Sequence, residues 1–100
     1  SVDRVYEIVT GGEDYIILDV RNPDEYEEGH IEGAVLIPVS ELEDRLDEIP
    51  GNKPVITYCK AGSRSARAAS ILAENGFLEV YDMGGITEWI DSGYPVTGGE

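Results

Sequence analysis

Residues 54–65 read PVITYCKAGSRS, and this segment sets the architecture of the chain. Its first five residues form an apolar, β-favouring run, which is typical of a strand covered on both faces. Cys59 stands at the carboxyl end of that predicted strand. Arg64 to Asn75 then carries small and aliphatic residues at helical spacing, and Gly76 ends the predicted helix. A buried strand leading directly into a helix indicates a parallel sheet with right-handed crossovers.

The same alternation of strands and helices extends to both sides of this segment. Further strands are predicted at 15–20, 34–38 and 79–83, and further helices at 2–9, 40–49 and 86–92, with one helical turn at 25–28. Ser40 and Glu43 have the spacing of a capping box. We expect Gly84 and Gly85 to form a tight turn and Ile90 to face the core. The predicted fold class is therefore α/β, with a mostly parallel central sheet and helices on both faces.

Length and composition limit the organisation and the partners of the chain. One hundred residues, 41% of them hydrophobic, suffice for one packed core, so we expect a single domain over residues 1–100. Seven Lys and Arg against 21 Asp and Glu give a net charge of −14, which disfavours nucleic acid and anionic membranes as partners. The amino-terminal residues do not resemble a secretory leader. We expect a cytoplasmic monomer.

The loop after the central predicted strand combines the chain's one cysteine with a local excess of positive charge. Lys60, Arg64 and Arg67 are three of the seven basic residues, and no acidic residue lies between Cys59 and Arg67. In parallel sheets, ligand sites lie beyond the carboxyl ends of the strands, where the first amides of a helix lack intrahelical acceptors. Gly62 lets the backbone curl so that these amides can point at sulfur. We therefore expect a stabilised, nucleophilic thiolate.

Three separated segments of the chain together resemble the rhodanese family of sulfurtransferases. They are LDVR (18–21) with EY (25–26) and GHIEGA (29–34), CKAGSRS (59–65), and GG (84–85) with Trp89 and GYP (93–95). The resemblance implies a rhodanese-like domain in which Cys59 takes a sulfane sulfur from a small sulfur-containing anion such as thiosulfate. The sulfur would stand on Cys59 as a persulfide and pass to cyanide, a thiol or a sulfur-accepting protein. No cofactor or metal is implied.

The other residues of these segments receive supporting roles. The candidate substrate-binding residues are Lys60, Ala61, Gly62, Ser63, Arg64 and Ser65. The resemblance implies that Arg64 braces the loop or meets the anionic donor, whereas Ser63 and Ser65 suit helix capping equally well. Asp19 and Arg21 are predicted to form an ion pair of the scaffold. His30 is predicted to be structural rather than a catalytic partner of the cysteine.

Other functions remain compatible with part of the sequence. Cysteine phosphatases and arsenate reductases also use a thiolate ringed by amides and an arginine, but five residues separate that pair in them, and only residues 60–63 separate Cys59 from Arg64 here. A regulatory binding module would not need the cysteine that this chain keeps. A persulfide carrier that hands sulfur to a protein partner fits the sequence as well as an enzyme that detoxifies cyanide.

Overall fold

A four-stranded parallel sheet in the order β2-β1-β3-β4 forms the centre of the computed structural model, which describes residues 1–98. The strands are β1 (Ile16–Asp19), β2 (Val35–Leu36), β3 (Val55–Cys59) and β4 (Val80–Gly85). Cys59 is thus the last residue of an inner strand. The predicted parallel sheet is confirmed. The last two residues of the domain predicted over 1–100 lie outside the described residues.

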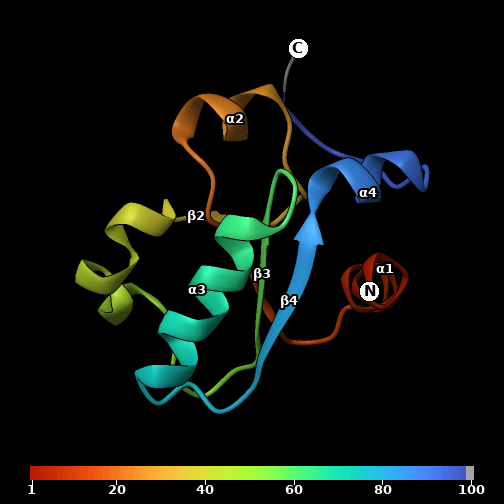
Figure 1. The fold of residues 1–100 in the computed structure, drawn as a ribbon. Helices are drawn as coiled ribbons and strands as arrows, with labels where there is room; N and C mark the ends of the chain where they lie inside the picture. The colour runs from red at the N-terminus through yellow and green to blue at the C-terminus, as the bar shows by residue number, and fades with distance from the viewer. Residues whose placement is uncertain (99–100) are drawn as a thin grey trace.

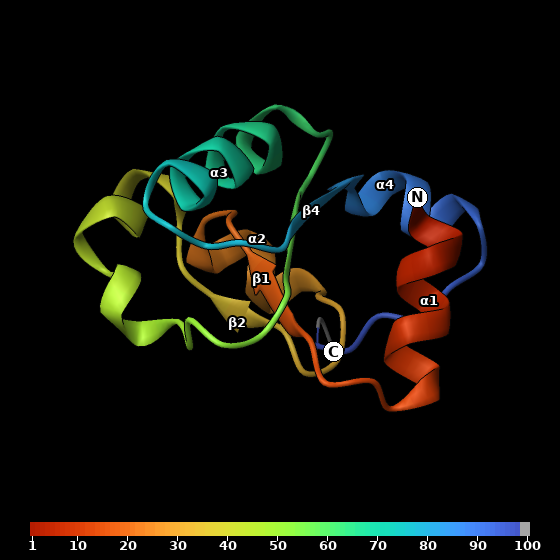
Figure 2. The same ribbon diagram turned by 90° about the horizontal axis from the view of Figure 1, so that it is seen from below.

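Helices cover both faces of the sheet, as the sequence predicted. One face carries α1 (Val2–Gly11) and α4 (Ile86–Asp91), and the other carries α3 (Ser63–Glu74). Figure 2 shows α1 and α3 on opposite sides of the strands, and Figure 1 shows α2 (Pro23–Glu28) near the turn that leads into α3. Within the described residues, no helix is both long and apolar enough to cross a membrane.

Two apolar clusters, one on each face, hold the sheet between the helices. The α1 face buries Val5 and Ile8 of α1 together with Ile56 of β3 and Trp89 of α4. Trp89 also donates its indole N–H to the carbonyl of Pro95 at 2.8 Å, which fixes the segment after α4. On the α3 face, the aliphatic stripe of the helix is buried against the strands and against the chain between β2 and β3; its members are Ala68, Ile71 and Leu72. Burying these side chains supplies most of the driving force for folding.

The segment predicted as a helix over 40–49 is instead a pair of short 3₁₀ helices, η1 (Val39–Asp44) and η2 (Leu46–Glu48). The prediction was wrong because an apolar residue every three or four positions fits a 3₁₀ period as well as an α period. The predicted capping box also fails, since η1 follows Pro38 directly and Ser40 lies inside it. The apolar stripe itself is buried, with Leu42 fully enclosed.

Smaller differences concern element ends. β2 has two residues rather than the five predicted at 34–38: Pro38 has no amide hydrogen, although Ile37 and Val39 on either side still donate to the β1 edge. Helix α2 starts at Pro23, with proline at its first position, rather than at residue 25. The pair Gly84-Gly85 belongs to β4 instead of forming a separate turn. Ile90, expected to face the core, is half exposed.

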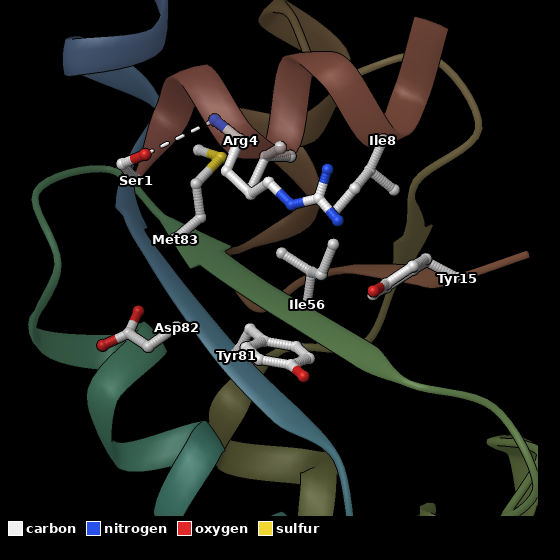
Figure 3. A pocket seen from close by; sticks show the side chains of 9 residues that line it. Ser1, Arg4, Ile8, Tyr15, Ile56, Tyr81, Asp82 and Met83 are labelled. Atoms are coloured by element: carbon white, nitrogen blue, oxygen red, sulfur yellow. Dashed lines mark hydrogen bonds between the residues drawn. The ribbon is translucent and has the colours of Figure 1, made fainter. Parts of the chain in front are cut away.

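A small hollow of about 140 Å³ lies between α1 and the strands β3 and β4, on the face opposite α3. Figure 3 shows Arg4 and Ile8 of α1 above Ile56 of β3 and Tyr81 of β4. None of the loop residues 59–65 lines this hollow. It is therefore separate from the cysteine at the end of β3.

Candidate active site

The Cys59 sulfur accepts hydrogen bonds from the backbone that follows it. The chain turns back after Lys60, and the amide of Gly62 donates to Cys59 Sγ at 3.0 Å. Gly62 has φ +119°, a conformation that side chains other than glycine's rarely adopt, so this turn depends on glycine. The backbone N–H groups of Arg64 and Ser65, in the first turn of α3, also lower the pKa of the Cys59 thiol. The start of α3 thus forms a cradle of N–H groups for an anion.

Opposing effects set the pKa of the Cys59 thiol. Burial raises it, because the residue is only 1% exposed and a thiolate loses solvation there. Hydrogen bonds from Ser65, Gly62 and Arg64 outweigh burial, so the pKa lies below its ordinary value. The Ser65 hydroxyl carries one hydrogen and lies 3.0 Å from the carbonyl of Gly62, so we attribute the stabilisation mainly to backbone amides. The arrangement favours a thiolate without a separate general base.

The cradle is held against the sheet from two sides. Thr57 of β3 donates its hydroxyl to the carbonyl of Ser65 at 3.0 Å, and both side chains are fully buried. On the other side, the Lys60 carbonyl accepts from the Thr87 amide at 3.3 Å and from its hydroxyl at 3.1 Å. A Cβ at Gly85 would lie 2.4 Å from that same carbonyl. The end of β4 therefore packs directly under the loop.

Arg64 faces a carboxylate from α2. Its Nη1 and Nη2 donate to Glu25 Oε1 and Oε2 at 2.7 Å and 3.0 Å, a bidentate pair across 39 residues of sequence. The hydrogen bonds from Arg64 lower the pKa of Glu25 to about 2. The pKa of Arg64 is raised, chiefly by its hydrogen bonds to Glu25, with a smaller contribution from the charge of Cys59. No pattern in the sequence predicts this role for Glu25.

A buried ionic network supports the ends of β1 and β3. Arg21 Nη2 lies 2.7 Å from Asp19 Oδ2 and donates to the Gly29 carbonyl at the same distance. The Tyr58 hydroxyl donates to Asp19 Oδ2 at 2.8 Å and accepts from the amide of Ile31 at 3.1 Å. Asp19 and Tyr58 are fully enclosed. This network fixes the segment after α2 against the residue that precedes Cys59.

The remaining predicted residues lie at varied distances from this chemistry. His30 stacks on Tyr26 with ring centroids 3.6 Å apart, and its Nδ1 lies 2.8 Å from the Tyr26 carbonyl. Its backbone pairs with Thr97, so its contacts are those of a residue that organises the chain. Lys60 and Ala61 are exposed on the loop, and Ser63 is the exposed first residue of α3.

A hollow of about 220 Å³ adjoins the loop between α2 and α4. Charged groups line one side of it, from Arg21, Glu25, Glu28 and Lys60. The other side is apolar, from Ile86, Ile90 and Val96. In the part of the chain that the structure describes, no group of three metal-ligating side chains is present. The hollow can admit a small molecule or a side chain of a partner next to the cradle.

A comparison with protein families identifies this arrangement. The sequence model of the rhodanese-like domain matches residues 1–92. The chain belongs to the rhodanese family. The resemblance found in its three sequence segments is therefore confirmed.

Two of the following three relatives of this rhodanese domain carry names connected with sulfur. The chain is 40% identical over 77 residues to the thiosulfate sulfurtransferase GlpE of Coxiella burnetii, covering 76% of this chain and 72% of GlpE. It is 37% identical over 90 residues to the putative sulfur carrier protein YrkF of Bacillus subtilis, covering 89% of this chain and 49% of YrkF. It is 49% identical over 74 residues to the uncharacterized protein YqhL of Bacillus subtilis, covering 73% of this chain and 59% of YqhL. The chain thus spans less than two thirds of YqhL and YrkF.

Solved structures agree with this assignment. The rhodanese-related protein of Thermoplasma volcanium superposes with a TM-score of 0.86 at 37% identity, covering 96% of this chain and 93% of that protein. The whole rhodanese fold is therefore shared.

Three residues at this rhodanese site carried no assigned role from the sequence. Glu25 pairs with Arg64, the Tyr58 hydroxyl donates to Asp19, and Gly85 packs against the backbone of the loop. Glu25 and Gly85 lie in the three sequence segments that resemble the rhodanese family. That resemblance marks both residues, but it does not predict what either one contacts. Nothing in the sequence pattern separates Tyr58 from an ordinary core tyrosine.

Proposed function

We propose that the protein is a sulfurtransferase that carries a sulfane sulfur as a persulfide on Cys59. The observation that carries this proposal is the Gly62 amide 3.0 Å from the Cys59 sulfur, within a cradle of backbone donors that lowers the pKa of the thiol. The same donors suit a persulfide anion, which also needs N–H groups to stabilise its charge. Membership of the rhodanese family and a relative named thiosulfate sulfurtransferase support it.

The proposed reaction has two displacements. The Cys59 thiolate attacks the outer sulfur of thiosulfate, the S–S bond to the sulfonate sulfur breaks, and sulfite leaves with the bonding electron pair. A thiolate or cyanide then attacks the terminal sulfur of the persulfide, and the Cys59 thiolate leaves. No net oxidation occurs and no proton need be removed. Because Cys59 must return as a free thiolate, we also propose a reducing compartment such as the cytoplasm.

Intact mass tests this proposal. Incubation with thiosulfate should add one sulfur atom to the protein, and subsequent cyanide should remove it. The variant Cys59→Ser should show neither event, while Ser70→Ala, on the exposed side of α3, should still gain sulfur. A wild-type protein that stays unmodified with thiosulfate and with an organic sulfane donor would refute the proposal.

A sulfur carrier is the second candidate, favoured by the apolar side of the hollow beside the loop. Ile90 and Val96 are partly exposed there, which suits contact with a protein acceptor, and YrkF is named as a putative sulfur carrier. Turnover separates the two functions. An enzyme should transfer many sulfur atoms per Cys59 to cyanide or a small thiol, whereas a carrier should keep its persulfide through an hour with either acceptor. Hydrolysis of an aryl phosphate should be absent in both cases.

A further inference from the structure

Arg64, in the first turn of α3, is already paired in this structure with Glu25, which lines the hollow beside the loop. Both of its terminal nitrogens donate to the two oxygens of Glu25. A guanidinium uses this same pair of donors to bind a sulfonate or sulfate group. A thiosulfate dianion must therefore displace the Glu25 carboxylate or approach a pair whose net charge is zero.

Few other positive charges in the hollow beside the loop compensate for the neutralisation of Arg64 by Glu25. Arg21 lines the hollow, but Asp19 binds its guanidinium at 2.7 Å. Lys60 lines it too, and no ion pair holds it among the residues the structure describes. Glu28 adds a further carboxylate on the same side. A donor with two negative charges thus meets a hollow in which Lys60 is the one lining cation that forms no ion pair within residues 1–98.

We infer that Glu25 is a specificity-determining residue that disfavours dianionic donors such as thiosulfate relative to organic sulfane donors carrying one negative charge. This inference rests on the proposed sulfur transfer and adds its donor class. The favoured donors are alkanethiosulfonate anions and alkyl persulfides, whose alkyl group can also contact Ile86 and Ile90 in the hollow.

Two donors that differ by one charge test the inference. Methanethiosulfonate has the same sulfane sulfur on a sulfonyl group as thiosulfate, but a methyl group replaces one charged oxygen. Loading of Cys59 leaves methanesulfinate in one case and sulfite in the other, so both reactions balance without an oxidant. Single-turnover loading, followed by intact mass at fixed ionic strength, gives a half-saturating concentration and a maximal rate for each donor.

The variant Glu25→Gln keeps an oxygen for the Asn22 amide and frees the charge of Arg64. It should raise the thiosulfate-to-methanethiosulfonate ratio of loading efficiencies about ten-fold, the order expected when one unit charge is removed several ångströms away at a solvated mouth. The gain should appear in the half-saturating concentration of thiosulfate, with the maximal rate changed less than two-fold. Glu27→Gln, an equal charge change on the exposed side of α2, should leave the ratio unchanged.

Further variants exclude simpler explanations. Adding Arg64→Gln to Glu25→Gln should abolish the gain, because the freed guanidinium is the proposed receptor. A gain that survives in the double variant, or a ratio unchanged in the single variant, would overturn the inference. If Glu25→Gln does not fold, the wild type alone tests the inference. Its thiosulfate-to-methanethiosulfonate ratio of loading efficiencies should be lower than the ratio of the rates at which 2-mercaptoethanol reacts with the two donors in solution. Failure to load from either donor would instead refute the sulfurtransferase proposal.

Discussion

Cys59 depends on its neighbours in sequence for the stability of its thiolate. A thiol this buried would have a raised pKa if it faced only side chains such as those of the α3 cluster around it. Gly62, Arg64 and Ser65 reverse that effect because they supply amide hydrogens at the start of α3. The same residue type a few positions earlier in β3 would remain a core hydrophobe.

Gly85 is the residue on which the position of this loop depends. A methyl group there would lie 2.4 Å from the Lys60 carbonyl oxygen and 2.9 Å from the Ala61 Cα, both backbone atoms. Gly85→Ala should therefore displace the loop, lower the rate of Cys59 persulfidation at least ten-fold, and reduce the free energy of unfolding by about 1–3 kcal/mol. Loading by mass and urea denaturation measure both effects.

Gly51→Ala is the matched control for this prediction. Gly51 lies in an exposed turn, and a Cβ there meets no atom within 4 Å. It should change neither persulfidation nor stability appreciably. Equal behaviour of the two variants would show that the loop does not rest on β4 as described.

The residues of the site differ in how far the sequence could predict them. Cys59, Gly62 and Ser65 act through a local turn, so their positions follow from a strand end, a glycine and a helix start. Glu25 meets Arg64 across 39 residues, and no local pattern specifies which of 21 acidic residues does so. Long-range pairs of this kind require the folded sheet before they can be assigned.

The elements show the same division between local and long-range causes. Helix α3 was predicted closely because its stripe, its glycine start and its end are all local signals. The structure of residues 39–48 was not predicted, because the spacing of its apolar residues fits an α-helix as well as a 3₁₀ helix. Packing against α3 and the ion pairs of Arg45 with Glu41 and Glu48 favour two 3₁₀ helices. β2 is shorter than predicted for a local reason, because Pro38 has no amide hydrogen to donate.

The contact between α2 and α3 gives the fold a measurable dependence on pH. The guanidinium of Arg64 lowers the pKa of Glu25 to about 2 from its ordinary value of 4.5. A lowered carboxyl pKa stabilises the folded state above 4.5, and this contribution is lost as the pH falls through 2. Between pH 5 and pH 2 the wild type should lose about 1 kcal/mol more stability than Glu25→Gln, a value kept small because the pair is partly in solvent.

Urea midpoints measured at intervals between pH 5 and pH 2 provide this comparison. Arg64→Gln should flatten the profile to the same degree as Glu25→Gln, since both remove the same ion pair. Parallel profiles for wild type and both variants would mean that the pair does not join α2 to α3 in solution.

At the scale of the whole molecule, the carboxyl ends of three strands and the amino end of one helix meet at the candidate site. β1 ends at Asp19, β3 at Cys59 and β4 at Gly85, and α3 starts at Ser63. Parallel strands bring their carboxyl ends to one edge, which is why the sequence order alone predicts a candidate site at this edge. The net charge of −14 is a property of the entire chain, whereas residues 59–67 at that edge carry three basic residues and no acidic one.

This net charge should slow the encounter with an anionic donor. Surface charges repel thiosulfate over distances of about 10 Å at 0.1 M salt and farther at lower salt. Loading efficiency of the wild type with thiosulfate should therefore rise about two- to five-fold between 10 mM and 200 mM sodium chloride. Alkylation of Cys59 by iodoacetamide, which is uncharged, should stay constant over the same range and so exclude an effect of salt on the thiolate. A thiosulfate profile that is flat or falls with salt would mean that local charges at the loop outweigh the field of the whole molecule.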